Sequence, residues 1–331
     1  MKANIFLVMG SQIDNNSSWN NVCIIGLGGH AQNKLLPALQ SSGLQVVGLV
    51  SRTPSSVISG AKTFSNISDA ISSLDKTTLF IIASPPNIHY AQVKEVLESG
   101  RDVFVEKPGF LSLNEAAELS RLACDNGIVL VEMLMYLENS SVQHIIHELK
   151  SASGSLKSLE CHFLIPRVPR DTFRTEESFS NSLLSDMVCY PLSLLAKAGY
   201  ELSDLTLVSD NFLGEGNPVF SITGNSKQAN IQIMVGQGEK YINNLKLTFN
   251  NSDEISCEPF FFGRAGYRTM TRLNKNGKHV GRILESNSYE RMFLRRRAEW
   301  LVDQKDRLDT LKLVSDALER IGRQASLLYY F

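Results

Sequence analysis

Short apolar runs that alternate with helix-like segments fill residues 21–136, and no other feature of the sequence restricts the fold as strongly. The strand-like runs are NVCII, LQVVGLV, TLFII, RDVFV and IVLVEML, with glycine-terminated amphipathic segments between several of them. Apolar strands that alternate with helices indicate a parallel sheet covered by helices on both faces. This part of the chain is therefore predicted to be an α/β doubly wound parallel sheet.

The pattern changes after residue 136. LKSLECHFLIP, VFSITG, ANIQIMVGQ and LKLTFN are strand-like pieces, several with period-two alternation, parted by Gly, Asn and Ser turns. One helix is expected at 182–198 and a charged helical tail at 288–328. We predict a C-terminal α+β domain with a mainly antiparallel open sheet. The expected division is an N-terminal extension at 1–20, a first domain at 21–136 and a second domain at 137–331.

The composition excludes several classes of protein. The chain has 331 residues, of which 43% are hydrophobic, and its formal net charge of −1 predicts no nucleic-acid partner. No run approaches the roughly 18 apolar residues of a membrane span, so no membrane partner is expected either. Five scattered cysteines without a Cys-x-x-Cys pair indicate reduced thiols, which favours a cytoplasmic protein. His144 and His147 lack an apparent third ligand, so we expect no metal site.

A glycine-rich turn follows the first strand and opens a helix, in the pattern G-x-G-x-x-A. The motif consists of Gly26, Leu27, Gly28, Gly29, His30 and Ala31. Gly26 would permit the tight turn, Gly28 would let a pyrophosphate approach the backbone, and Ala31 would allow close helix packing. This context predicts a Rossmann-type dinucleotide-binding domain; a structural glycine turn is the alternative.

The end of the second strand bears on which dinucleotide binds. Sites for NAD usually place an acidic residue there to hold the ribose 2′-hydroxyl, whereas this chain has Ser51 and Arg52. A hydroxyl and a guanidinium would bind a 2′-phosphate that a carboxylate would repel. We therefore predict NADP(H), with NAD(H) as the alternative and a solvated surface arginine as the structural reading of Arg52.

Two further strand ends should lie at the same edge of the sheet, where ligands of doubly wound sheets bind. The third strand is followed by Ser84, Pro85, Asn87 and His89, where the dinucleotide should run. The fourth ends in Glu106, Lys107 and Pro108. Lys107 would project toward the nicotinamide, with Glu106 available to hold it by charge; the alternative is a strand-end ion pair.

This combination resembles the Gfo/Idh/MocA oxidoreductases, which are two-domain NAD(P)-dependent enzymes acting mostly on sugars and related polyols. The resemblance rests on the glycine turn, on the stretch A-S-P-P-N-I-H and on E-K-P, and it extends over roughly residues 21–195. It implies that Glu106 and Lys107 lie in the cofactor and substrate cleft.

The family also carries an aromatic-Arg pair and, later, G-G-G-x-L-x-D-x-G-x-[HY]. Phe173-Arg174 matches the pair, Asp186 matches the aspartate and Tyr190 matches the final acid/base position. The three glycines are absent, and Val188 replaces another, which puts the placement of Asp186 and Tyr190 in doubt. The tyrosine is similar to that of sugar ketoreductases and glucose–fructose oxidoreductase.

The residues themselves also point to this segment. Asp186 and Tyr190 are four apart in an apolar helix, so they share a face, and a buried aspartate needs a partner. A phenol with a carboxylate neighbour and an ammonium could pass a proton to a nascent alkoxide. The alternative is a helix-capping aspartate and a core tyrosine.

Three arginines precede this helix and could bind the diphosphate of a sugar nucleotide. They are Arg167, Arg170 and Arg174. Surface pairing with nearby acidic residues is the alternative for the first two, and Arg174 is favoured because it matches the family's aromatic-Arg pair.

We expect an NADP(H)-dependent oxidoreductase that transfers hydride between nicotinamide and a sugar or keto-sugar, with Lys107 and Tyr190 managing the proton. The sugar could be linked to a nucleotide. One alternative is dehydrogenation of a free sugar, polyol or diol; another is a non-catalytic NADP(H)-binding regulatory protein. A homodimer or homotetramer is expected from the family.

Overall fold

The structure is a computed structural model that describes residues 19–51, 58–151, 155–167, 182–210, 218–262, 267–275, 278–286 and 288–329. Most of the predicted N-terminal extension lies outside these ranges, and so do Arg52, Arg170 and Arg174. None of the described helices is long and apolar enough to cross a membrane.

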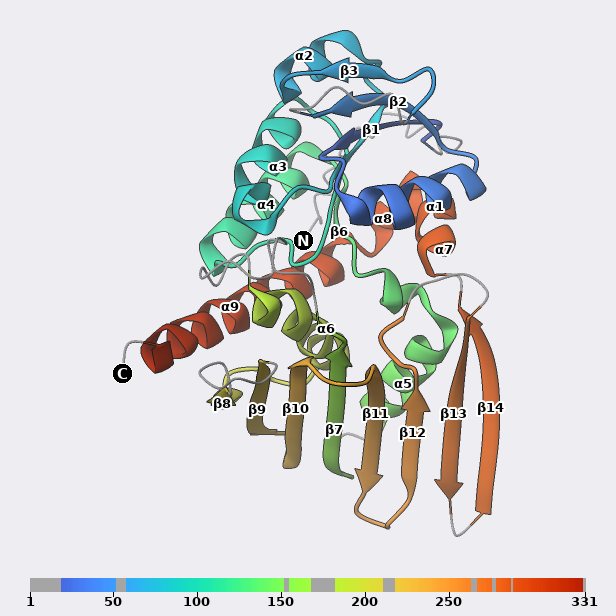
Figure 1. Cartoon of the computed structure of the whole chain (residues 1–331), viewed down its shortest axis with the longest axis vertical. Helices are drawn as coiled ribbons and strands as arrows, with labels where there is room; N and C mark the ends of the chain where they lie inside the picture. The colour runs from blue at the N-terminus through green and yellow to red at the C-terminus, as the bar shows by residue number, and fades with distance from the viewer. Residues whose placement is uncertain are drawn as a thin grey trace, which may run out of the picture.

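The first sheet has six strands in the order β3-β2-β1-β4-β5-β6, and every neighbouring pair is parallel (Figure 1). The strands are β1 Asn21–Ile25, β2 Gln45–Val50, β3 Lys62–Phe64, β4 Leu79–Ile82, β5 Val103–Val105 and β6 Leu130–Glu132. The helices are α1 Leu36–Ser41, which continues the helical turn Ala31–Leu35, α2 Ile67–Ser73, α3 His89–Glu98 and α4 Leu113–Asn126. The strand order reverses between β1 and β4, where dinucleotides bind in such sheets.

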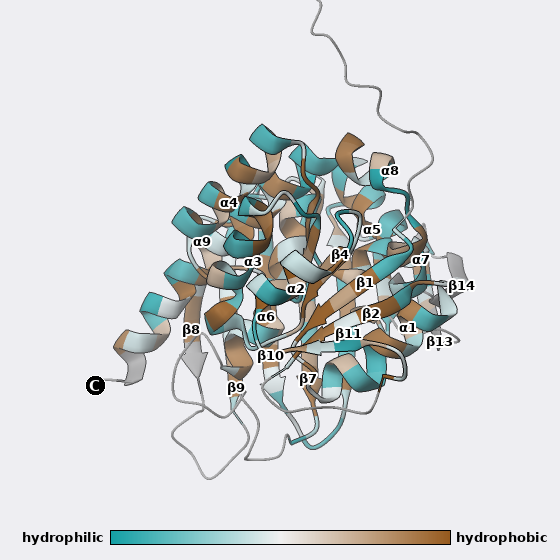
Figure 2. Cartoon of the chain, turned by 90° about the horizontal axis from the view of Figure 1, so that it is seen from above, coloured by the Kyte–Doolittle hydropathy of each residue, from teal (hydrophilic) through white to brown (hydrophobic). Residues whose placement is uncertain are grey.

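Both faces of this sheet are buried, as the apolar strands predict. Along β4, Phe80 and Ile82 belong to one core while Leu79 and Ile81 belong to the other. Helices α2, α3 and α4 supply the first core, and α1 contributes to the second. Figure 2 shows the hydrophobic colour of β1 and β4 between these helices. The doubly wound Rossmann-type prediction is confirmed.

The second sheet has eight strands in the order β14-β13-β12-β11-β7-β10-β9-β8. Their bounds are β7 Leu156–Ile165, β8 Thr206–Asp210, β9 Val219–Ser226, β10 Ala229–Gln237, β11 Ile242–Phe249, β12 Glu254–Glu258, β13 Tyr267–Lys275 and β14 Lys278–Ser286. Only β7 and β10 pair in parallel, and all the other neighbours are antiparallel. Helix α5, Ser140–Ser151, precedes this sheet. The mainly antiparallel prediction is confirmed.

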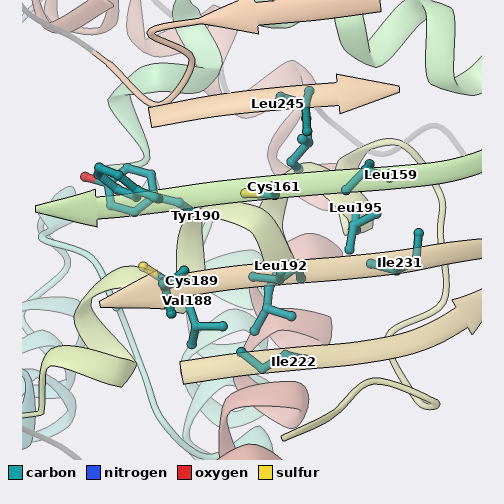
Figure 3. Close-up of a cluster of buried hydrophobic side chains, with 14 of the residues drawn as sticks. Leu159, Cys161, Val188, Cys189, Tyr190, Leu192, Leu195, Ile222, Ile231 and Leu245 are labelled. Carbon is teal, nitrogen blue, oxygen red and sulfur yellow. The ribbon is translucent and has the colours of Figure 1, made fainter. Parts of the chain in front are cut away.

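Helix α6, Leu183–Lys197, corresponds to the helix predicted at 182–198, and nearly its whole length is buried. Ser182 caps it by accepting a hydrogen bond from the Ser185 amide, so Asp186 lies in the first turn and is not the cap. In Figure 3, Val188, Leu192 and Leu195 of α6 lie against side chains of the second sheet. This core holds the helix that carries Asp186 and Tyr190.

The helical tail predicted at 288–328 is present, and it consists of three helices. They are α7 Ser288–Leu294, α8 Arg297–Val302 and α9 Gln304–Tyr329. Phe293 of α7 and Trp300 of α8 pack on Phe104 of β5, at ring centroid distances of 6.3 and 5.3 Å. The tail therefore returns to the first sheet, on the face that α1 also covers.

Helix α9 runs between the two sheets (Figure 1). Leu308 and Leu311 near its start belong to the core of the first sheet, while Val314, Leu318 and Ile321 belong to the core of the second. The division of the chain at residue 136 stays a prediction. The described contacts add that the tail packs on both sides of that division.

Candidate active site

The glycine turn lies between β1 and the first helix, as predicted. Gly26 has φ +90°, and a Cβ atom there would lie 3.0 Å from backbone atoms of Ala83 and Ser84. Only glycine combines this conformation with so close an approach of the β4 loop. A Cβ at Gly28 would meet nothing within 4 Å, so the backbone there is open on one side. This open backbone at a helix start fits a dinucleotide pyrophosphate.

Ser51 directly follows β2 at the same edge of the sheet. The Gly26 amide donates a hydrogen bond to the Val50 carbonyl at 3.0 Å, which keeps the end of β2 beside the glycine turn. No carboxylate stands at position 51. The position of Ser51 is therefore compatible with a 2′-phosphate, while Arg52 lies outside the described residues.

His89 is buried, with 1% of its surface exposed, and both ring nitrogens contact backbone carbonyls. Nε2 lies 2.9 Å from the Ser84 oxygen, and Nδ1 lies 3.1 Å from the Pro108 oxygen. Burial lowers the pKa of His89 despite these acceptors. The ring thus joins the loop after β4 to the turn that follows Lys107. A direct contact with a dinucleotide, as predicted, would require these bonds to be given up. Pro85 and Asn87 in the same loop are exposed.

Glu106 is 7% exposed and contacts the glycine turn. Its Oε1 lies 2.8 Å from His30 Nε2, and the Tyr289 hydroxyl of α7 lies 3.0 Å from the same nitrogen. Burial works to raise the pKa of the Glu106 carboxyl, but His30 and Lys107 outweigh it and lower the pKa below its ordinary value. Glu106 and His30 thus connect two of the predicted cofactor-binding segments.

The Lys107 ammonium is held by Asp186, whereas the sequence suggested Glu106. Nζ donates to Asp186 Oδ1 at 2.6 Å and to the Asp186 carbonyl at 2.9 Å. The two side chains are only 10% and 7% exposed. Glu106 and Lys107 directly follow β5, and the first contacts His30 while the second contacts α6. The interaction joins the first sheet to the second-domain helix.

Tyr190 completes this group from the next turn of α6. Lys107 Nζ lies 4.8 Å from its ring centroid, within the range of a cation–π interaction. Phe163, Tyr136 and Phe261 surround the ring at centroid distances of 5.4, 5.4 and 5.6 Å. In Figure 3 the Tyr190 hydroxyl points away from the labelled core side chains. The pattern of Asp186 and Tyr190 on one helix face is therefore present, despite the missing glycines.

Burial raises the pKa of the Tyr190 phenol well above its ordinary value. A phenol is protonated at neutral pH and can donate a proton; burial makes Tyr190 a weaker acid, and the Lys107 charge works in the opposite direction. Lys107, Asp186 and Tyr190 can together hold a polar oxygen and supply it with a proton.

Three residues of this region were not singled out from the sequence. Tyr136 donates to the Tyr190 carbonyl at 2.9 Å and so fixes α6, while Tyr289 contacts His30 from the C-terminal tail. Glu132, at the end of β6, accepts from the Gly109 amide at 2.8 Å. Of these three, only Glu132 could have been identified from the sequence, because it is a carboxylate at the end of an apolar strand that neighbours the strand before Lys107.

Comparisons with known proteins agree with this architecture. Residues 20–133 match the GFO_IDH_MocA model, described as an oxidoreductase family with an NAD-binding Rossmann fold. A dTDP-3,4-didehydro-2,6-dideoxy-alpha-D-glucose 3-reductase of Streptomyces violaceoruber is 24% identical over 277 residues, which is 80% of each chain. Biliverdin reductase A of Homo sapiens is 37% identical over 103 residues, which is 30% of this chain and 34% of that protein.

Solved structures share the whole fold at low sequence identity. A 3-ketoreductase from Actinomadura kijaniata, in complex with NADP and TDP-benzene, has a TM-score of 0.72 and 18% identity over 89% of this chain and 95% of its own. UDP-N-acetylglucosamine 3-dehydrogenase from Acidithiobacillus ferrooxidans also has a TM-score of 0.72, with 15% identity over 93% of this chain and 98% of its own. With the family match, the strand order and the glycine turn in agreement, residues 20–133 belong to the Gfo/Idh/MocA family, and the chain is an NAD(P)-dependent oxidoreductase related to it.

Proposed function

We propose that the protein is an NADP(H)-dependent reductase of a keto group on a sugar that is carried by a nucleoside diphosphate. The observation that carries the proposal is the buried contact of Lys107 Nζ with Asp186 and with the Tyr190 ring. An ammonium and a neutral phenol at one point are suited to a carbonyl oxygen that becomes a hydroxyl.

The roles of the side chains follow from their surroundings. The bound nicotinamide supplies the hydride. Lys107 donates a hydrogen bond from Nζ to the substrate oxygen, and Asp186 holds the ammonium in place through Oδ1. Tyr190 gives the proton from its hydroxyl, and the nearby Lys107 charge favours this step because it works to lower the pKa of the phenol. Phe163 and Phe261 exclude water from one side of this ring.

The cofactor would be held by the predicted strand-end residues. Gly28 and its neighbours offer an open backbone for the pyrophosphate, and Ser51 stands where an acid would select NAD. Arg52 is proposed to pair with a 2′-phosphate. The Actinomadura kijaniata ketoreductase structure contains NADP, which supports this choice. An Arg52→Ala variant should lose about tenfold in NADPH affinity, measured by fluorescence titration, while its NADH affinity stays the same. Unchanged NADPH affinity would argue against the assignment.

Two observations support a substrate that carries a nucleoside diphosphate. The relatives' names include dTDP-linked and UDP-linked sugars. The segment before α6 contains Arg170 and Arg174, whose guanidiniums would suit a diphosphate.

The direct test measures NADPH oxidation by absorbance with matched substrates. A dTDP-linked keto-sugar, a UDP-linked keto-sugar and the same keto-sugars without nucleotide should be compared at equal concentration. Turnover of the nucleotide-linked compounds above the free ones supports the proposal. Turnover of free sugars or polyols alone would instead favour the dehydrogenase alternative. Binding of NADPH without turnover of any compound would favour a regulatory role.

A further inference from the structure

Glu132 is a half-buried residue whose carboxyl group the proposed reaction does not use. It ends β6 and packs on the turn that follows Lys107. Its Oε1 accepts the Gly109 amide at 2.8 Å, and a Cβ atom at Gly109 would lie 3.3 Å from Glu132 Cγ. Because Gly109 is two residues beyond Lys107, this contact fixes the turn that carries the ammonium.

The second oxygen of Glu132 has an unusual environment. Oε2 is shielded from solvent and has no hydrogen-bond partner among the described residues. A buried carboxylate oxygen without a donor costs several kcal/mol, so such a group tends to keep its proton. Burial raises the pKa of Glu132 to about 7, although the Gly109 hydrogen bond and the Lys107 charge work to lower it.

The charges near Glu132 favour its neutral form as well. From the end of β5, Glu106 works to raise the pKa of Glu132 and Lys107 works to lower it. From α6, Asp186 already occupies the Lys107 ammonium. An ionised Glu132 would therefore place a further carboxylate around one ammonium that already has a partner. Cys189 and Tyr190 of α6 are the other titratable groups on this side, and burial raises the pKa of both.

On its other side Glu132 borders a cavity of about 370 Å³. The cavity lies between the short helical turn Met135–Glu138, α6 and the C-terminal helices. The basic groups around this cavity are Lys150, Lys197, Arg295 and Arg307. Glu138, Asp303 and Asp306 form salt bridges with the last three of them. Their charges largely offset one another, so Lys107 is the cation that matters most to Glu132.

We propose that Glu132 is a positioning residue for Lys107: it holds the turn through the Gly109 amide, and below neutral pH its uncharged carboxyl group leaves the ammonium with Asp186. This rests on the proposed role of Lys107 in the reaction. Loss of the Glu132 proton creates a second carboxylate that competes with Asp186 for the ammonium. Alkaline pH then draws Lys107 away from the substrate position.

The first test uses the full-length protein without cofactor or substrate. Glu132→Gln keeps an oxygen acceptor for Gly109 but cannot ionise. A carboxyl with a raised folded-state pKa contributes stability that is present at low pH and is lost as pH rises through that pKa. The thermal unfolding midpoints of wild type and Glu132→Gln should therefore coincide near pH 5 and separate by pH 8, with the variant more stable. Glu98→Gln, on the exposed surface of α3, is the matched control.

A second measurement asks whether the proton is coupled to Lys107. Removing the ammonium in Lys107→Met removes the charge that lowers the Glu132 pKa. The stability difference between Lys107→Met and the double variant Lys107→Met/Glu132→Gln should therefore be larger at pH 8 and level off at a higher pH than the difference for the pair with Lys107 intact. Equal stability differences that level off at the same pH in both pairs would overturn the coupling.

The activity arm separates this inference from the proposed function. With any reducible substrate, the turnover rate of wild type should fall above pH 7, while that of Glu132→Gln should not. The ratio of the variant's rate to the wild-type rate should be about threefold or more at pH 8.5 and near one at pH 6. Parallel pH profiles would overturn the inference even if the keto-sugar is turned over. If no substrate is found, the proposed function fails, and the two stability measurements still decide the role of Glu132.

Discussion

The two halves of the active site are built differently. Lys107 comes from a turn after a three-residue strand, and hydrogen bonds join its neighbours Glu106, Pro108 and Gly109 to His30, His89 and Glu132. Asp186 and Tyr190 lie instead on a helix buried along almost its whole length. Polar contacts hold the turn that carries Lys107, whereas apolar packing holds the helix that carries Asp186 and Tyr190. Substitutions in the first should therefore change chemistry, and substitutions in the second should also change stability.

The largest effect is expected from the helix half. Asp186→Ala leaves the buried Lys107 ammonium without its ion-pair partner, which should cost about 3–5 kcal/mol in the free energy of unfolding. Chemical denaturation would measure this loss, and Lys107→Met in the same background should recover part of it. A cost below about 1 kcal/mol would mean that the pair is not held as described.

The next effect concerns turnover and involves one residue from each half. Lys107→Ala in the turn and Tyr190→Phe in the helix should each lower turnover by about 10²-fold or more, while NADPH binding persists. Steady-state rates and cofactor titration provide the two readouts. Lys62→Met on the exposed strand β3 and Tyr200→Phe in the second core are matched controls. Full activity of both site variants would refute the proton-transfer assignment.

The smallest pair of effects concerns two glycines of one turn. Gly26→Ala introduces a Cβ at φ +90° that lies 3.0 Å from the β4 loop, so stability should fall by roughly 1–3 kcal/mol. Gly28→Ala meets nothing within 4 Å and should leave the unfolding midpoint unchanged while it weakens NADPH binding. Equal destabilisation by both variants would contradict the distinction between a packing glycine and a ligand-facing one.

The sequence predicted the elements of the site better than their partners. Apolar strands with glycine turns identify the parallel sheet, and the spacing of four places Asp186 and Tyr190 on one helix face. Lys107 and Asp186 are 79 residues apart in the sequence, and their pairing depends on how the first sheet packs against α6. Local residue spacing therefore cannot predict it. For the same reason Glu106 was expected to hold the Lys107 ammonium, although its carboxylate contacts His30.

The C-terminal tail illustrates the same limit. Tyr289 and Trp300 occur in a segment rich in charged residues, and its composition predicts a solvated helical surface. Both side chains are nevertheless buried, at 6% and 2% exposure, because the chain returns to the first sheet. The packing of the C-terminal tail on the first sheet depends on the tertiary fold, so the local sequence of the tail does not predict it.

Helix α9 has a mechanical consequence. Its 26 residues span about 39 Å, with apolar side chains fastened into the core of one sheet near its start and of the other farther along. A helix that packs in both cores opposes a hinge motion, because moving the two sheets apart would expose the apolar side chains of α9 in one of the cores. We therefore expect the two sheets to move together as one unit.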